Sequence, residues 1–164
     1  MADKNIGASD PRRFHNGGLL IISDGTDNFT VKKIRSGTAR CRDGRRSIAY
    51  AADQGAQLRP RLGDKQYSSI ELDVEFTDEH GTDSLQDLMS LAAVTDGNVP
   101  EYTVTIIWLD DLDETAGIQV TYALSHFSES FSIEGTADGE HGDTVPIRMM
   151  SRTEEGVWAD YTAA

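Results

Sequence analysis

The sequence lacks the features that mark a secreted, disulfide-bonded or membrane protein. Its single cysteine, Cys41, has no partner for an internal disulfide and suits a reducing cytoplasm. The longest apolar run, at residues 19–22, is far shorter than the roughly 20 residues that span a bilayer. Residues 1–14 contain no apolar stretch of the kind that a secretory signal needs. We therefore expect one domain with one core, made in the cytoplasm and without a membrane partner.

Positive charge is almost absent from the C-terminal part of the chain. Residues 66–164 hold two Lys or Arg and 21 Asp or Glu, a net charge of −19. Residues 1–65 hold 13 Lys or Arg and seven Asp or Glu, a net charge of +6, and the two values sum to the formal −13. Such asymmetry favours a nucleic-acid or membrane partner, or another copy of the chain stacked head to tail. The alternative is an acidic surface that only keeps the protein in solution.

Motifs of catalysis and of cofactor binding are also missing. The four histidines stand far apart, and none has a second histidine or a cysteine at zinc-like spacing. The sequence contains no nucleophile elbow, phosphate-binding glycine loop or dinucleotide fingerprint. Acidic loops at residues 110–115 and 138–143 leave weak cation binding open, although the first lacks the glycine and the closing glutamate of a calcium loop. We expect no enzyme, no resident metal and no cofactor.

The clearest pattern is the stretch QYSSIELDVEFTD at residues 66–78, in which apolar and acidic residues alternate strictly. Successive side chains of a strand point to opposite faces, so one face is apolar and the other carries three like charges. We expect neighbouring strands to offer uncharged partners that relieve the repulsion. The acidic positions are Glu71, Asp73 and Glu75. The uncharged candidates are Thr103, Thr105, Thr121 and Ser125.

Similar alternation predicts most of the secondary structure. One helix is expected at residues 83–95, capped by Ser84 and with Leu85, Leu88, Met89 and Ala92 on its buried face. Pro146 predicts that the last strand lies at a sheet edge. The strands are expected at residues 19–23, 29–34, 47–50, 66–77, 102–108, 118–124, 127–133 and 144–150. Seven or eight short strands with one helix predict an antiparallel β-sandwich or barrel, with the helix on its flank.

Three segments fall outside these elements. Residues 1–17 are predicted to form an extended N-terminal arm, residues 35–65 a long basic loop and residues 151–164 a C-terminal tail. The loop has no aromatic residue among its arginines to stack on a base, and the acidic remainder of the chain would repel nucleic acid. An acidic surface of another copy is a better complement. The basic candidates are Arg40, Arg42, Arg45 and Arg46, and the acidic partners are Asp110, Asp111, Asp113 and Glu114.

The order of these features resembles the tail tube (major tail) proteins of long-tailed bacteriophages, whose fold is shared in outline with the type VI secretion tube. The similar parts are the arm, the hairpin LLIISDGTDNFTVKKI, the basic excursion, GDKQYSSIELDVEF, one helix, and the hairpin YTVTIIWLDDLDETAGIQVTYAL. The resemblance implies a β-sandwich that forms stacked hexameric rings, and so a hollow tube through which DNA passes during ejection.

The resemblance also implies partners and a location. Residues 35–65 would reach the adjacent ring, and the arm and the tail would add further inter-ring contacts. The partners would be other copies of the chain and the tape-measure, tail terminator and baseplate proteins, in a virion made in the host cytoplasm.

Within such a tube, the acidic strip gains a possible role. A cationic wall would bind DNA through counterion release, whereas an anionic wall repels it over a Debye length of about 8 Å. We therefore expect Glu71, Asp73 and Glu75 to face the lumen, the alternative being the outer surface of the tube. Other functions that stay open are a virion decoration or baseplate β-sandwich, a carbohydrate- or receptor-binding module, and a small hydrolase.

Overall fold

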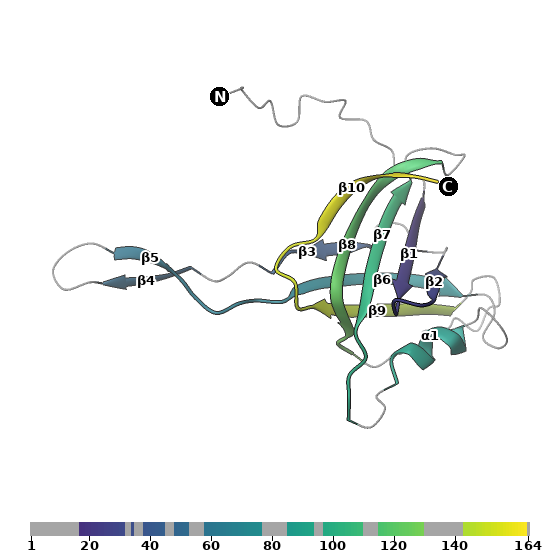
Figure 1. Ribbon diagram of the computed structural model, residues 1–164, viewed down its shortest axis with the longest axis horizontal. Coiled ribbons are helices and arrows are strands. Elements are labelled where there is room, and N and C mark those ends of the chain that lie inside the picture. The colour runs from purple at the N-terminus through teal and green to yellow at the C-terminus, as the bar shows by residue number, and fades with distance from the viewer. Residues whose placement is uncertain are drawn as a thin grey trace.

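The described chain is mainly antiparallel β structure, with one short helix, α1 (Leu85–Leu91) (Figure 1). A computed structural model describes residues 17–31, 34, 38–44, 48–52, 58–76, 85–93, 97–109, 115–129 and 143–163. The strands are β1 (Gly17–Ser23), β2 (Asn28–Val31), β3 (Arg40–Arg42), β4 (Ile48–Ala52), β5 (Leu58–Leu62), β6 (Ser68–Phe76), β7 (Tyr102–Leu109), β8 (Ala116–Phe127), β9 (Asp143–Ser151) and β10 (Val157–Thr162).

Eight of the strands form one sheet that folds over itself. Its order is β2-β1-β7-β8-β9-β6-β3, and β10 also pairs with β8. Figure 1 shows β1, β7 and β8 crossing β6 and β9 steeply, so the sheet makes two walls around a core. An isolated bridge between Ile34 and Val74 joins the segment after β2 to β6. The predicted antiparallel sandwich or barrel with one flanking helix is confirmed.

The core is built from alternate residues of both walls. Ile70, Leu72 and Val74 of β6 are fully buried, whereas Glu71 between them is exposed. This confirms the alternation that the sequence predicts. Burying one such aliphatic side chain stabilises the fold by roughly 1.5–3 kcal/mol. The other fully buried aliphatic residues of the core are Leu20 and Ile22 of β1, Val104 and Ile106 of β7, Val120 of β8, and Val145 and Ile147 of β9.

The helix is shorter than predicted and turns a different face to the core. It begins at Leu85 and ends at Leu91, and its predicted cap, Ser84, lies outside the described residues. Leu88 and Leu91 are buried, but Met89 is 41% exposed, so the predicted contact of Met89 with the core is wrong. A helix this short has room for one buried pair at i and i+3 spacing, and this pair excludes Met89.

Strand β8 belongs to both walls because it contains an extra residue. Its first half pairs with β10, and its last three residues pair with β9. Opposite β7, the register places one residue between Tyr102 and Val104 against two between Tyr122 and Ser125, which is a β-bulge. Leu124 within the bulge has a φ of 51°. A bulge bends its strand, so this is where β8 leaves one wall and enters the other.

The prediction of an edge strand at Pro146 is wrong, because β9 lies between β6 and β8. The backbone N–H and C=O of Asp73, which faces Pro146, bond the hydroxyl of Thr38 on the side away from β9. In an antiparallel pair, the backbone nitrogen of Pro146 must then also point away from β6. On that side β8 pairs only with Met149 to Ser151. Pro146 therefore removes no ladder hydrogen bond within the described sheet.

The described part of residues 35–65 contains three strands, where the sequence predicted a long loop with one short strand at residues 47–50. Arg40–Arg42 form β3, which pairs with β6. Cys41 is half-buried on the inner side of β3, and both arginines are exposed. The strands β4 and β5 pair as a hairpin that projects from the body (Figure 1). Because β5 contains Pro60, the sequence did not predict this strand. Both strands of a lone hairpin are edge strands, where proline is tolerated.

The C-terminal part differs in a similar way. The strand predicted at residues 127–133 is wrong at its start, because Phe127 is the last residue of β8, and residues 130–142 lie outside the described residues. The tail forms β10, in which the ring of Trp158 stacks on that of Trp108 at a centroid distance of 5.8 Å. The tail is thus attached to the body. The arm at residues 1–16 lies outside the described part of the chain.

The bulge gives a stability prediction at Leu124, which is 45% exposed and has a positive φ. A left-handed conformation costs an L-residue about 1–2 kcal/mol, and glycine avoids most of this cost. We expect Leu124→Gly to be more stable than Leu124→Ala by about 1 kcal/mol, measured by urea denaturation. Because both variants lose the same exposed side chain, an equal or lower stability of the glycine variant would contradict the strained bulge.

Candidate assembly surfaces

The projecting hairpin, β4 and β5, is the first candidate surface. Among the described strands, β4 and β5 pair with each other and with no other strand. Ile48 at the start of β4 is 61% exposed. An isolated two-stranded hairpin is marginally stable in water, so this hairpin is suited to being covered by another molecule. The fold therefore presents an element that its own body does not support.

The hairpin segment leaves the body at Asp43, whose side chain is held by two hydrogen bonds. The Oδ1 atom of Asp43 accepts a hydrogen bond from the hydroxyl of Tyr122 in β8 at 3.0 Å. The same oxygen accepts a second one from the backbone N–H of Gly156 at 3.2 Å. A side chain at Gly156 would have no space, because its Cβ would lie 2.6 Å from Cζ of Tyr122. The start of the hairpin is thus held by β8 and by the turn before β10.

The two legs of the hairpin touch at this point. Gly44 is buried, and a Cβ there would collide with the backbone of Gln66 and Tyr67 on the returning leg. The N–H of Gly44 donates to Oγ of Ser68 at 3.0 Å, and the hydroxyl of Ser68 donates to the carbonyl oxygen of Thr153 at 2.7 Å. The outgoing leg, the returning leg and the C-terminal turn therefore share one hydrogen-bonded chain.

Three serines with no exposed surface lie side by side beneath this chain. Ser151 of β9 is directly opposite Ser68 of β6 on one side and Ser125 of β8 on the other. Each hydroxyl has a partner: that of Ser151 donates to the carbonyl of Ala123 at 2.6 Å, and that of Ser125 donates to the carbonyl of Tyr122 at 3.2 Å. Because buried hydroxyls are costly unless they are bonded, this row fixes the local geometry.

We call this group the hairpin root; it consists of Asp43, Gly44, Ser68, Tyr122, Ser125, Ser151, Thr153 and Gly156. Sequence analysis did not identify any of these residues as part of a site. Asp43 and Gly44 fell within the predicted basic loop, and nothing in the sequence relates them to residues 122 or 156, because hydrogen bonds between distant segments leave no local pattern.

Burial also changes the pKa of two groups, Cys41 beside the root and Tyr122 within it. It raises the pKa of the Cys41 thiol to about 12, with a smaller lowering by a hydrogen bond with Tyr122 and a smaller raising by the charge of Asp43. Burial likewise raises the pKa of the Tyr122 hydroxyl, and the nearby Cys41 and Asp43 raise it further. Both groups are protonated at neutral pH, so Cys41 is a poor nucleophile and Tyr122 remains a hydrogen-bond donor.

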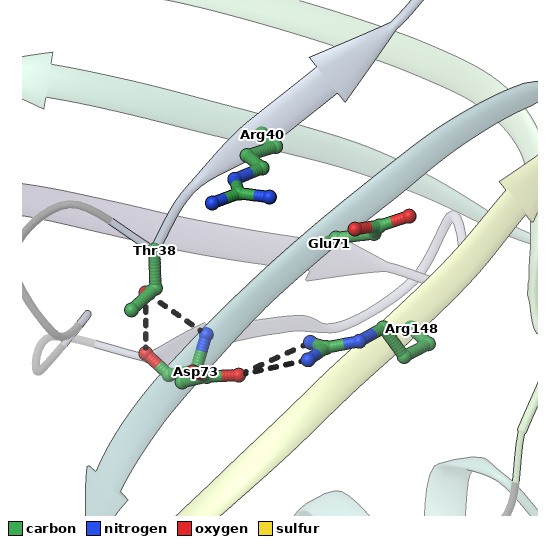
Figure 2. A pocket seen from close by; sticks show the side chains of 5 residues that line it. All are labelled: Thr38, Arg40, Glu71, Asp73 and Arg148. Carbon is green, nitrogen blue, oxygen red and sulfur yellow. Dashed lines mark hydrogen bonds and ion pairs between the residues drawn. The ribbon is translucent and has the colours of Figure 1, made fainter.

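The outer face of β3, β6 and β9 is the second candidate surface, and it carries charges of both signs. This face has a depression of about 180 Å³, lined by Thr38, Arg40, Glu71, Asp73 and Arg148, whose side chains are drawn in Figure 2. In the register, Glu71 lies between Arg40 on one side and Arg148 on the other. The expectation of an acidic strip flanked by uncharged partners is therefore wrong: two arginines stand beside it.

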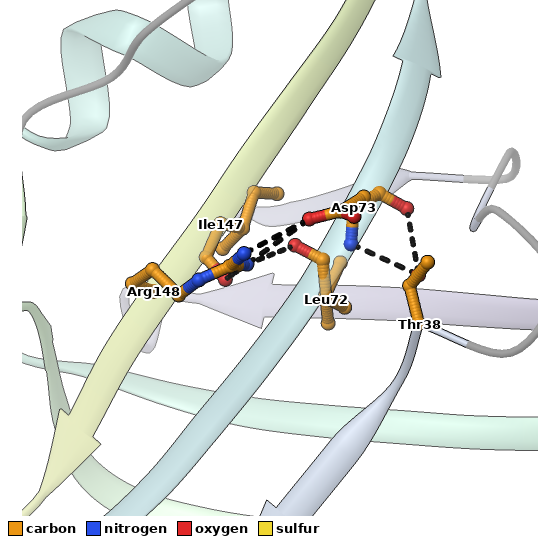
Figure 3. A network of polar contacts seen from close by, with 5 residues as sticks. All are labelled: Thr38, Leu72, Asp73, Ile147 and Arg148. Carbon is orange, nitrogen blue, oxygen red and sulfur yellow. Dashed lines mark hydrogen bonds and ion pairs between the residues drawn. The ribbon is translucent and has the colours of Figure 1, made fainter.

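A forked ion pair fastens β6 to β9 on this charged face. Both terminal nitrogens of Arg148 donate to Oδ1 of Asp73 at 3.1 Å (Figure 3). One of them also donates to the carbonyl oxygens of Leu72 and Ile147, at 2.9 Å and 3.0 Å. This diagonal pair relieves the repulsion along the strip. Among the described residues, Arg40 and Glu71 form no ion pair within 4 Å and stay open to a partner.

The third candidate surface is the outer face of β2, β1, β7, β8 and β10, which is uncharged. One row across these five strands reads Thr30, Ile21, Thr105, Thr121 and Val157. The hydroxyls of Thr105 and Thr121 are hydrogen-bonded at 2.9 Å. The neighbouring rows contain Asn28, Ser23 and Thr103 on one side, and Leu19, Ile107, Gln119 and Ala159 on the other. The threonines predicted to adjoin the acidic strip thus line the opposite wall, and Ser125 is buried.

The structure describes only some of the residues singled out from the sequence. Arg40 and Arg42 are exposed on β3, next to the start of the hairpin. Glu75 pairs with Thr144 through the backbone of β6, and its side chain is not described. Arg45, Arg46, Asp110, Asp111, Asp113 and Glu114 lie outside the described residues.

The described side chains include no group of three His, Cys, Asp or Glu placed to hold a metal ion. No described helix has both the length and the apolar character to cross a membrane.

The fold is shared with chains of contractile injection systems. A chain in the cryo-EM structure of the PVC sheath-tube complex, an extracellular contractile injection system in its extended state, has a TM-score of 0.62 at 10% identity over 93% of this chain and 95% of that one. A chain in the PVC sheath/tube terminator structure has a TM-score of 0.61 at 13% identity, over 93% and 99%. A chain in the anti-feeding prophage (AFP) tube terminating cap has a TM-score of 0.62 at 14% identity, over 98% and 97%.

These identities are low, so the likeness establishes a common fold that spans nearly the whole of each chain. No family model and no curated protein matches the sequence.

The fork between Asp73 and Arg148 can be measured by a double-mutant cycle with alanine at each position. Because the side chains are only 25% and 30% exposed and the geometry is charge-assisted, we expect a coupling free energy of unfolding of about 1–2 kcal/mol. The matched control is the ion pair of Glu101 and Arg152, which are 32% and 51% exposed; there we expect roughly 0.2–1 kcal/mol. Equal coupling in the two cycles would show that the fork has no special role.

Proposed function

We propose that this chain is a structural subunit of the hollow tube of a phage tail or of a related contractile particle, assembled from stacked, hexameric rings. The observation that carries the proposal is the hairpin of β4 and β5, which projects from a fixed root and pairs with no other described strand. The fold shared with chains from sheath-tube, terminator and cap structures supports it. The proposed role is structural rather than catalytic.

Head-to-tail stacking gives the hairpin a partner. Copies related by such a contact use two different surfaces, so the contact repeats without limit and builds a filament. The residues 1–65 that contain the hairpin carry a net charge of +6, and the rest of the chain carries −19. Arg40 and Arg42 beside the root are exposed and available to acidic residues of the next ring. Single rim ion pairs contribute little, about 0–1 kcal/mol, so repetition around a ring must supply the strength.

Side-by-side contacts within a ring have candidate positions at the sheet edges. In the described sheet, β2 pairs on one side with β1, and β10 pairs on one side with β8. Open edges are the usual places where another copy adds to a sheet. We propose that neighbours in a ring meet at these two edges, which would make the uncharged face continuous around the bore.

The uncharged face also suits a conduit better than the charged face does. A bore that DNA passes must not hold it, and exposed arginines bind phosphate. The rows of Thr105 and Thr121 contain no charged residue, whereas Arg40 and Arg148 stand beside Glu71 on the other wall. We therefore propose that the uncharged face lines the bore. The lumen position of Glu71, Asp73 and Glu75 stays a prediction, and the labelling experiment below distinguishes the two faces.

This proposal includes the partners that a tube requires. Tape-measure, tail terminator and baseplate proteins would set its length and close its ends, and double-stranded DNA would pass without adhering. The protein would be made in the host cytoplasm and reside in the particle. A second candidate is a ring that ends a tube, because chains in the terminator and cap structures share the fold equally well. A terminating ring stops at one layer, whereas a tube subunit polymerises.

Polymerisation and its dependence on the basic residues test the proposal. We expect the purified protein to form long hollow filaments of uniform width in negative-stain microscopy. Replacing Arg40, Arg42, Arg45 and Arg46 together by serine should leave a folded monomer that does not polymerise, because the cationic side of the inter-ring contact is lost. Arg40→Ser with Arg42→Ser should raise the critical concentration at least several-fold.

The control is Arg152→Ser, compared with Arg42→Ser alone; it removes the same charge from an exposed residue outside the hairpin and β3. Its critical concentration should change little. Normal filaments from the fourfold variant would exclude this basic cluster as the inter-ring contact. A wild-type protein that forms only single rings would favour the terminating role.

The face that lines the bore can be identified by thiol labelling of assembled filaments. In a Cys41→Ala background, Thr103→Cys reports on the uncharged face and Glu71→Cys on the charged face, since both positions are exposed in the monomer. A maleimide carrying a polyethylene glycol too bulky for the bore should label Glu71→Cys and spare Thr103→Cys. Both should react in the monomer. The reverse result in filaments would place the acidic strip in the lumen.

A further inference from the structure

One carboxylate oxygen holds two segments that the proposed function assigns to different contacts. Asp43 begins the hairpin, which is proposed to reach the next ring, and Gly156 precedes β10, which is proposed to meet a neighbour in the same ring. Oδ1 of Asp43 receives the N–H of Gly156 at 3.2 Å and the hydroxyl of Tyr122 at 3.0 Å. The segment proposed for stacking and the segment proposed for lateral contact are therefore held by the same carboxylate oxygen.

The packing around this oxygen leaves little freedom to either segment. A Cβ at Gly44 would collide with the returning leg, and one at Gly156 would lie 2.5 Å from Cγ2 of Val120. A second connection runs parallel to the first, from Gly44 through Ser68 to the carbonyl of Thr153. Two hydrogen-bonded routes thus connect the hairpin to the C-terminal turn, and neither depends on a long or flexible side chain.

We infer that Asp43 and Tyr122 are positioning residues that couple the hairpin to β10, so that the stacking contact and the lateral contact are set together. The inference rests on the proposed function, for which it supplies a mechanism. Ordering a segment opposes binding, and a root that is fixed before assembly lowers this cost. Coupling is reciprocal: a neighbour that immobilises β10 also stabilises the hairpin in its docking orientation, and a docked hairpin stabilises β10. Rings would then favour stacking, and stacking would favour rings.

The monomer offers a direct test by hydrogen exchange. Tyr122→Phe removes the hydroxyl that holds Asp43 and keeps the buried ring. The matched control is Tyr102→Phe, which removes the hydroxyl of a second buried tyrosine, whose bond, 2.6 Å to the carbonyl of Leu91, lies at the end of α1. Tyr122→Phe should speed exchange roughly five- to tenfold, the change expected for one lost hydrogen bond, both at Gly44 and along β10. Tyr102→Phe should speed exchange near α1 and leave Gly44 and β10 unchanged.

Asp43 gives the complementary pair of variants. Asp43→Asn keeps a side-chain oxygen that can accept both hydrogen bonds, whereas Asp43→Ala removes it. Faster exchange at Gly44 and β10 is therefore expected for the alanine variant and largely absent for the asparagine variant. Acceleration of only one segment by Tyr122→Phe, or equal effects of Tyr122→Phe and Tyr102→Phe, would overturn the coupling.

Assembly supplies the functional readout. At matched thermal stability, Tyr122→Phe should raise the critical concentration for filaments several-fold above that of Tyr102→Phe, because only the first variant loosens the hairpin. Equal critical concentrations would mean that the root does not position the hairpin for stacking. If the wild-type protein does not polymerise at all, the proposed function fails, while the exchange experiment on the monomer still decides whether the two segments are coupled.

Discussion

The fold depends on one β-bulge in β8, which contains Leu124. Up to Thr121 this strand pairs with β10, and from Ser125 it pairs with β9, because the bulge between them turns it from one wall into the other. Without that turn, the buried rows of the two walls would not face each other across a common core. The hairpin root is built at the same place: Tyr122 lies just before the bulge and Ser125 just after it. Strand β8 therefore both joins the two walls and holds the base of the projecting hairpin.

The described charged side chains lie on the outer surfaces of the fold and not in its core. The charged face holds two arginines against the acidic strip, and the forked pair of Asp73 and Arg148 binds β6 to β9. Arg40 and Glu71 stay unpaired with other described side chains beside it. The uncharged face consists mainly of threonine and aliphatic residues, and the hydroxyls of Thr105 and Thr121 bond each other. Two walls of one sandwich thus present chemically different exteriors.

Local pattern was enough to predict the elements whose environment is uniform along their length. Ile70, Leu72 and Val74 alternate with polar residues because one side of the strand is buried and the other is not, and β2 and the first half of β7 follow the same rule. The failures have specific causes. Pro146 sits where the second neighbour of β9 is missing, and Pro60 sits in a hairpin with two open edges. The root escaped prediction because Asp43, Tyr122 and Gly156 meet only through tertiary structure.

The contact between the two legs of the hairpin has a consequence for variation of the chain. Because Gly44 lies against the backbone of Gln66 and Tyr67, the polypeptide departs from the body and returns to it at nearly one point. A segment grafted between such closely spaced ends adds a loop-closure cost that grows only slowly with its length. Residues 45–65 can therefore be lengthened, shortened or exchanged as one segment, while the sandwich that carries them stays the same.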